Sequence, residues 1–179
     1  MNTDAQQPSV TPAANPAQID LTALTKGQEI ARARHEITRD TLVRYAGASG
    51  DFNPIHYNDA VATEAGLPGV IAHGMLTMGT AINGLVDAIG DPTAVREYSV
   101  RFTSPIEVPA TGAVTLEIVA VVGAIDDEAG IARIDLTAQV GDTKVLGRAR
   151  ATIALPAGSD TAGSVYPQGE TTARTGSAA

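Results

Sequence analysis

Residues 75–89 are apolar at almost every position, reading MLTMGTAINGLVDAI with only Asn83 and Asp87 strongly polar. A helix that is apolar nearly all round is typical of a protein interior rather than of a surface. About 15 residues at ~1.5 Å rise each would extend roughly 22 Å, about the width of a small sheet. The pattern therefore predicts a long buried central helix.

Strand-like runs surround this helix, one before it and four after it. Turn residues separate the runs, and Gly141-Asp142 is typical of a two-residue hairpin loop. One buried helix followed by an antiparallel meander predicts an α+β domain in which a sheet curls around the helix. The predicted strands cover residues 28–37, 97–102, 114–122, 131–140 and 144–155.

Two short helices are predicted between the first strand and the central helix. Thr38 is a candidate N-cap for the first helix, which Gly47 and Gly50 would end. Asn58 is a candidate N-cap for the second helix, over residues 59–65. The side chains expected to face inward on the first helix are Leu42, Val43, Tyr45 and Ala46.

The two ends of the chain, residues 1–18 and 157–179, are rich in Ala, Gly, Ser, Thr and Pro. Such segments bury too little apolar surface to offset chain entropy, so we expect two disordered tails around one domain at 19–156. The N-terminal residues lack a basic region followed by an apolar one, and no run approaches the ~18 apolar residues of a membrane span. We therefore expect a soluble, cytoplasmic protein that does not insert into a membrane.

The composition narrows the classes of function. Hydrophobic residues make up 44% of the 179 residues but aromatics only 3%, so Val, Ile, Leu and Ala must fill the core. The net charge is −8 and the Lys and Arg residues are scattered, which argues against a nucleic-acid partner. The absence of Cys excludes disulfides, zinc–thiolate sites and thiol nucleophiles.

The segment SGDFNPIH at residues 49–56 places the carboxylate of Asp51 five residues before the imidazole of His56. Each residue alone is more often structural, Asp as a turn former and His as a packed side chain. Pro54 fixes its own φ and biases Asn53 toward extended backbone, so the connection between them is stiff. A preorganised pair of this kind suits acid–base chemistry, in which either residue can be the acid or the base.

A second segment, IAHGM at residues 71–75, places Gly74 at the start of the central helix. A free N–H there can bind a thioester carbonyl oxygen and stabilise developing enolate charge, although tight packing explains a glycine equally well. We expect His73 to support the site by capping the helix or bracing the loop. Asn53 is first a turn residue, and orienting Asp51 or a water is its alternative role.

Other chemistries lack their patterns. His56 and His73 are 17 residues apart without HxxxH, HExxH or Cys, so no metal site is expected. Ser49 lies outside a GxSxG elbow, and no P-loop is present. Acid–base catalysis without a cofactor is what remains.

At these residues the chain resembles the MaoC-like (R)-specific enoyl hydratase/dehydratase family, whose signature is GDxNPxH followed by an HGM-type segment. The resemblance covers nearly all of residues 24–155. The stretches IAHGMLTMG, GDPTAV and EYSVRFTSPIEVP are especially similar to the catalytic B subunits of (3R)-hydroxyacyl-ACP dehydratases. One departure is Asn58-Asp59, which stands where relatives often carry an acidic residue two positions after the histidine.

The resemblance implies a hot-dog fold, with Asp51 and His56 as the catalytic dyad and the Gly74 N–H as the oxyanion hole. It implies dehydration of (3R)-hydroxyacyl-ACP to trans-2-enoyl-ACP in fatty-acid or mycolic-acid elongation, and the reverse hydration. His56 would be the base and Asp51 or a shared water the acid, and the sequence evidence is the same with these roles exchanged.

The resemblance also implies a partner, because the family works as paired hot-dog units. The expected partner is a hot-dog subunit that lacks the dyad, and a homodimer is the default otherwise. Two alternatives stay open: a homodimeric (R)-specific enoyl-CoA hydratase, and a non-catalytic subunit that only binds the acyl chain.

Overall fold

The computed structural model describes residues 18–156, so the tails predicted at 1–18 and 157–179 lie outside the described residues, apart from Gln18. Within residues 18–156, no helix is both long and apolar enough to cross a membrane. The elements in chain order are β1 (Glu29–Ile37), α1 (Arg39–Ser49), the 3-10 turn η1 (Pro54–His56), α2 (Asp59–Glu64), α3 (Gly74–Ile89), the 3-10 turn η2 (Pro92–Ala94), β2 (Val95–Phe102), β3 (Val114–Asp126), β4 (Ile131–Val140) and β5 (Thr143–Ala154).

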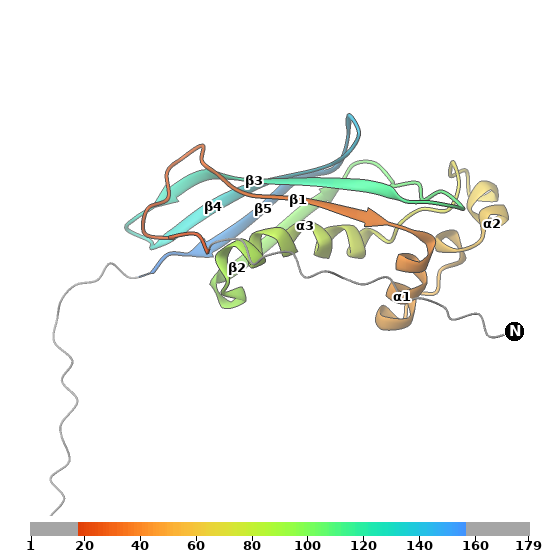
Figure 1. Cartoon of the computed structure of the whole chain (residues 1–179), viewed down its shortest axis with the longest axis horizontal. Helices are drawn as coiled ribbons and strands as arrows, with labels where there is room; N and C mark the ends of the chain where they lie inside the picture. The colour runs from red at the N-terminus through yellow and green to blue at the C-terminus, as the bar shows by residue number, and fades with distance from the viewer. Residues whose placement is uncertain (1–17, 157–179) are drawn as a thin grey trace, which may run out of the picture.

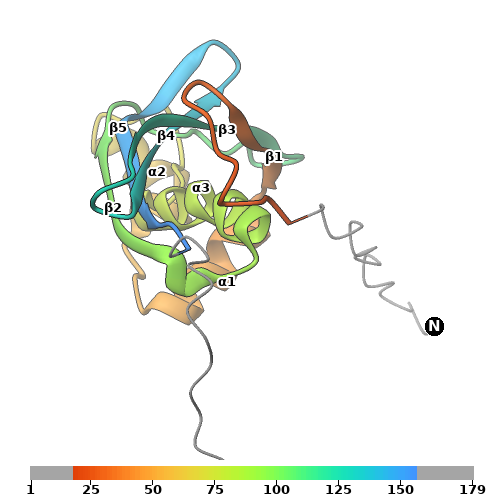
Figure 2. The same ribbon diagram turned by 90° about the vertical axis from the view of Figure 1, so that its left-hand side faces the viewer.

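The five strands form one antiparallel sheet in the order β1-β3-β4-β5-β2. The sheet curves over α3, which confirms the α+β hot-dog prediction (Figures 1 and 2). The predicted hairpin is also confirmed, because Val140 pairs with Thr143 across Gly141 and Asp142. Strand β3 continues beyond its predicted end at residue 122, through an irregularity in its pairing with β4.

The central helix α3 begins one residue before the predicted start and ends where predicted. Its burial is limited to one stripe, which packs under the sheet and consists of Thr77, Ala81, Leu85, Ala88 and Ile89. Met75, Asn83 and Asp87 are exposed, and Leu76 and Ile82 are only partly buried. The long central helix is confirmed, and in the single chain its fully buried residues lie on one side because one sheet covers one side of a helix.

Helix α1 follows the predicted N-cap but departs from two other expectations. The Thr38 side chain accepts a hydrogen bond from the Thr41 N–H, and Thr41 Oγ1 accepts from the Thr38 N–H, which forms a capping box. Gly50 ends the helix in the left-handed conformation, at φ 76°, so Gly47 lies inside the helix and does not end it. Val43 is 62% exposed, because the inward stripe runs through its neighbour Leu42.

The second short helix, α2, starts as predicted at Asn58, whose side chain accepts from the Ala60 and Val61 N–H groups. It is followed by a short pairing outside the main sheet, which we call the 70–72/106–108 ribbon. In this ribbon the Ala72 N–H donates to Ile106 O at 2.8 Å and the Val108 N–H donates to Val70 O at 2.8 Å. The ribbon holds the segment that leads into α3.

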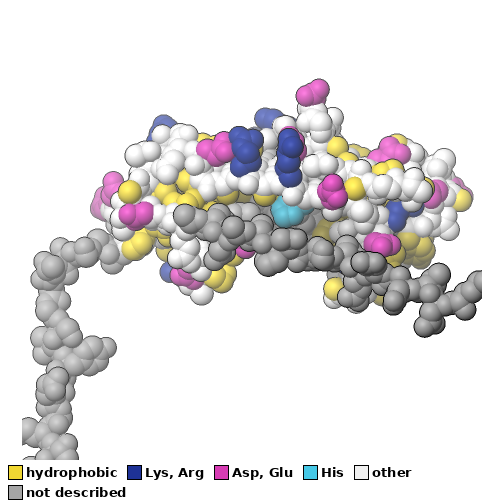
Figure 3. Space-filling model, in the orientation of Figure 1, with side chains coloured by type: hydrophobic (Ala, Val, Ile, Leu, Met, Phe, Trp, Pro, Cys, Tyr) yellow, Lys and Arg dark blue, Asp and Glu magenta, His cyan; other side chains and the backbone are white. Residues whose placement is uncertain are grey.

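The outer surface carries charges of both signs. Figure 3 shows acidic side chains spread over one face with basic ones among them. Two of the ion pairs involve β1, with Arg32 bound to Glu29 and Arg34 bound to Glu117 of β3. Exposed pairs of this kind contribute little to stability and keep the outer face of the sheet solvated.

Candidate active site

The turn η1 carries His56 and is specified by its own sequence. Asn53 is the N-cap, and its side chain accepts from the Ile55 N–H at 3.2 Å. Pro54 occupies the first position, where the missing N–H costs no hydrogen bond. His56 therefore enters the protein interior from a rigid turn, and it is 7% exposed.

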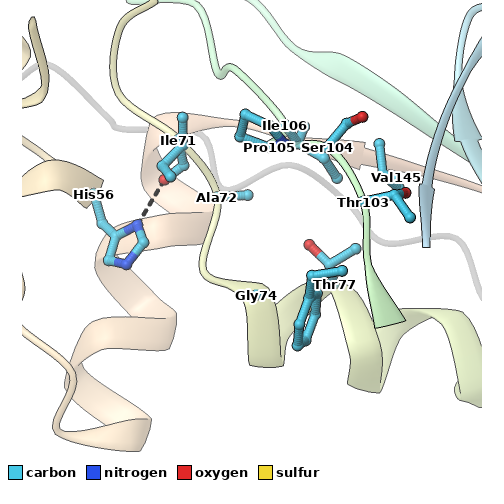
Figure 4. Close-up of a pocket in the computed structure, with 11 residues that line it drawn as sticks. His56, Ile71, Ala72, Gly74, Thr77, Thr103, Ser104, Pro105, Ile106 and Val145 are labelled. Atoms are coloured by element: carbon cyan, nitrogen blue, oxygen red, sulfur yellow. Dashed lines mark hydrogen bonds between the residues drawn. The ribbon is translucent and has the colours of Figure 1, made fainter. Parts of the chain in front are cut away.

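The imidazole of His56 is held in one tautomer. Its Nδ1 lies 2.7 Å from the carbonyl oxygen of Ile71, which can only accept, so Nδ1 carries the proton (Figure 4). The Ile71 N–H in turn donates to Ile55 O at 3.2 Å, so the two segments fix each other. In the neutral ring Nε2 then carries the lone pair and is free to take a proton.

Asp51 faces this nitrogen. Its Oδ2 lies 4.0 Å from Nε2 of His56, too far for a direct hydrogen bond but close enough for both atoms to contact one atom of a ligand. Its Oδ1 accepts from the Asn53 N–H at 3.2 Å. The side chain is 51% exposed, so Asp51 lies on the solvent side of the pair.

His73 lies behind His56. The two rings stack with centroids 3.8 Å apart and planes inclined by 24°. Nε2 of His73 donates to the backbone oxygen of Asp51 at 3.1 Å, so the side chain braces the loop. Its side chain makes no capping hydrogen bond to α3, so of the two supporting roles expected for His73 only the contact with the loop is present. Burial lowers the pKa of His73, and nearby His56 lowers it further.

Gly74 is the first residue of α3, and it lines a cavity of about 330 Å³ together with His56. A Cβ on Gly74 would lie 3.3 Å from the ring of Phe102, so the glycine also serves close packing. Asp51 is not part of the lining. The cavity is bordered by His56, Ile71, Ala72, Gly74, Thr77, Phe102, Thr103, Ser104, Pro105, Ile106 and Val145 (Figure 4).

Sequence reasoning missed three polar residues of this cavity. Thr77 lies one helical turn after Gly74, so the spacing of the helix could have revealed it. Its hydroxyl donates to His73 O at 3.2 Å. Thr103 and Ser104 directly follow β2, and no local sequence signal places them at the cavity.

A second cavity of about 270 Å³ is lined by both His56 and His73. Its walls are almost wholly apolar, and they include Phe52 and Tyr57, which are 61% and 51% exposed. These aromatics directly follow Asp51 and His56 in the sequence. His56 therefore forms part of the wall between two cavities.

Asp51, His56 and His73 each offer a donor atom, all within 4.8 Å of one another, which raises the question of a metal ion. Two nearly parallel rings direct their in-plane lone pairs side by side, whereas a tetrahedral ion needs donors that converge. Nδ1 of His56 and Nε2 of His73 are already bound to backbone oxygens. The geometry fits proton transfer better than metal ligation.

Residues 22–140 match the family described as the MaoC like domain. A curated relative, 3-hydroxyacyl-thioester dehydratase X of Mycobacterium tuberculosis, is 47% identical over 75 residues, which are 42% of this chain and 26% of that protein. The peroxisomal enoyl-CoA hydratase 2 of Arabidopsis thaliana is 43% identical over 60 residues, covering 32% and 19% of the two chains. The match thus spans about a quarter or less of these relatives' length.

Among solved structures, a MaoC-like dehydratase is similar in both fold and sequence. It superposes with a TM-score of 0.74 at 32% identity. The match covers 87% of this chain but 51% of the other, so the solved chain is considerably longer.

The lowered pKa of His73 predicts a pH-dependent stability. As the pH falls, His73 takes up a proton near pH 6.5 in the unfolded chain and only at a lower pH in the folded chain. The free energy of unfolding should therefore fall as the pH drops from 7 to 5. His73→Phe keeps an aromatic ring but cannot titrate, so its stability should fall less over this range. Urea denaturation at several pH values measures both slopes, and equal slopes would contradict the prediction.

Proposed function

The chain belongs to the MaoC-like family, and on this premise we propose that it is a hydro-lyase acting on acyl thioesters. It would interconvert a (3R)-hydroxyacyl thioester and a trans-2-enoyl thioester with release or uptake of water. Two relatives, named as a 3-hydroxyacyl-thioester dehydratase and an enoyl-CoA hydratase, support this reaction class. The observation that carries the proposal is the free Nε2 of His56, 4.0 Å from an Asp51 oxygen.

His56 acts as the base in this proposal. Its Nε2 removes the proton from Cα, and the electron pair moves into the thioester carbonyl to give an enolate-like charge. The Cβ–O bond then breaks as Asp51 or a water shared with it supplies a proton, and the hydroxyl leaves as water. Hydration follows the same path in reverse. The fixed Nδ1–H tautomer supports His56 rather than Asp51 as the base.

Gly74 supplies the place for the negative charge. The first N–H groups of a helix have no partner within that helix, and the dipole is positive there. Because Gly74 and His56 line one cavity, a carbonyl oxygen bound at the Gly74 N–H would leave Cα next to the base. This hydrogen bond would strengthen as the oxygen becomes anionic.

We expect Asp51→Asn and His56→Ala each to lower kcat/KM for hydration of a crotonyl thioester by at least about 100-fold, the usual effect of a missing general acid or base. Asp91→Asn is the matched control, because Asp91 lies beyond the far end of α3. Circular dichroism would show that the variants fold. Full activity in both dyad variants would instead favour the non-catalytic, acyl-binding subunit.

Proline at position 74 removes the N–H and adds the same Cβ contact with Phe102 that alanine adds. Proline is tolerated at the first helical position, and His73 before it already has the extended backbone that proline requires, at φ −60° and ψ 131°. Gly74→Pro should lower kcat by about 100-fold or more, as for loss of one oxyanion donor. Gly74→Ala adds a Cβ against Phe102 but keeps the N–H. If both variants lose the same activity, packing and not the N–H is the role of Gly74.

The carrier and the partner form the finer part of the proposal: an acyl-ACP substrate and a heterodimer with a second hot-dog subunit that lacks the dyad. The open side of α3 and several exposed apolar side chains support a partner of this kind. The length of the solved relative, of which this chain covers half, supports it too. The exposed side chains are Val43, Phe52, Tyr57, Met75 and Phe102.

We expect a higher kcat/KM for acyl-ACP than for the same acyl-CoA, and greater activity when the partner subunit is present. Native mass spectrometry gives the stoichiometry alongside the kinetics. A preference for CoA together with an active homodimer would replace this part of the proposal by a homodimeric (R)-specific enoyl-CoA hydratase.

A further inference from the structure

Arg39 is the first residue of α1, a position where a cation opposes the helix dipole. Its side chain is only 22% exposed. The Nε–H donates to Val108 O at 2.8 Å, and the two terminal nitrogens donate to the two carboxylate oxygens of Asp59 at 2.7 and 3.2 Å. These contacts, rather than the stability of α1, explain an arginine at this position.

Val108 belongs to the 70–72/106–108 ribbon, which lies outside the five-stranded sheet. A pairing of two segments this short has little stability of its own. Val70 and Val108 are fully buried, so an unbound carbonyl there would be costly. Arg39 binds the Val108 carbonyl and thereby holds the end of the ribbon.

The ribbon carries Ile71, whose carbonyl accepts the Nδ1–H of His56. Asp59 begins α2, three residues after His56. Arg39 therefore binds both sides of the contact between Ile71 and His56: the ribbon on one side and the segment following His56 on the other.

The ion pair between Arg39 and Asp59 differs from an ordinary surface pair of this chain in its burial and in its additional backbone hydrogen bond. Arg34 binds Glu117 on the neighbouring strand, and the two side chains are 76% and 32% exposed. Arg39 adds a backbone hydrogen bond to its bidentate pair, and its donation lowers the pKa of Asp59. The carboxylate thus stays charged and keeps both oxygens available to the guanidinium.

We propose that Arg39, held by Asp59, is a positioning residue that fixes the Ile71 carbonyl against Nδ1 of His56. It thereby keeps the imidazole in the tautomer with a free Nε2. The kinetic consequence rests on the proposed hydro-lyase function, whereas the effect on the tautomer does not depend on it.

The test compares Arg39→Met and Arg39→Lys with Arg34→Met, the control that removes an ion pair from the outer face of the sheet. Arg39→Met should lower kcat by about 10- to 100-fold, because a base displaced by a fraction of an ångström loses its alignment. KM should change by less than about twofold, since Arg39 does not line the cavity. Lysine keeps the charge but not the planar fork, so the kcat of Arg39→Lys should lie between that of the wild type and that of Arg39→Met. Arg34→Met should match the wild type.

Nitrogen NMR of the full chain with labelled histidine gives a readout independent of turnover. The wild type should show His56 with its proton on Nδ1, and Arg39→Met should show a mixture of tautomers. Unchanged His56 signals and kcat, with only a lower melting temperature, would overturn the proposal and leave Arg39 a purely structural residue. If the wild type lacks hydro-lyase activity, the proposed function fails while the NMR comparison still decides the positioning role.

Asp59→Asn is the second variant should Arg39→Met fail to fold. Asp59 is exposed at the start of α2, and asparagine keeps one acceptor for the guanidinium. We expect a smaller loss of kcat in the same direction and a partial loss of the single tautomer. His56 signals identical to those of the wild type in this variant would also overturn the proposal.

Discussion

The hydrogen bond from Nδ1 of His56 to the Ile71 carbonyl is the interaction on which the arrangement of the candidate site depends. A buried imidazole must satisfy its N–H or lose roughly 1–3 kcal/mol, so this 2.7 Å contact sets both the position and the tautomer of the ring. It also joins two segments 15 residues apart in the chain. One contact thus joins the turn η1, which carries His56, to the segment that leads into the central helix α3.

The curved sheet contributes by placing the start of α3 beside this contact. Tyr98 of β2 donates from its hydroxyl to Met78 O in the second turn of α3, which ties the edge strand to the helix. Burial raises the pKa of Tyr98 to about 12, so the hydroxyl remains a neutral donor at any physiological pH. With the helix fixed in this way, Gly74 and His56 line the same cavity.

The sequence predicts features whose causes are local. Capping by Thr38 and Asn58 and the Gly141-Asp142 hairpin each depend on a few neighbouring residues, and all three are confirmed. The spacing of Asp51 and His56 indicates an acid–base pair, and the structure brings the two side chains together. What the sequence cannot reveal depends on backbone atoms or on distant segments. A carbonyl such as that of Ile71 carries no side-chain signature, and the cavity residues Thr103 and Ser104 come from a segment about 30 residues after Gly74 in the sequence.

The central helix α3 differs between its sequence and its burial, and this difference bears on assembly. Its sequence is apolar nearly all round, yet in the described part of the chain only the stripe under the sheet is buried. Leu76 and Ile82 are half-covered, and Met75 is 59% exposed at the end of the helix where the site lies. Helix sequences usually match their surroundings, so an apolar second side is consistent with a second apolar surface packed against it. Because Met75 directly follows Gly74, a surface packed against that open side would lie next to one of the residues that line the cavity.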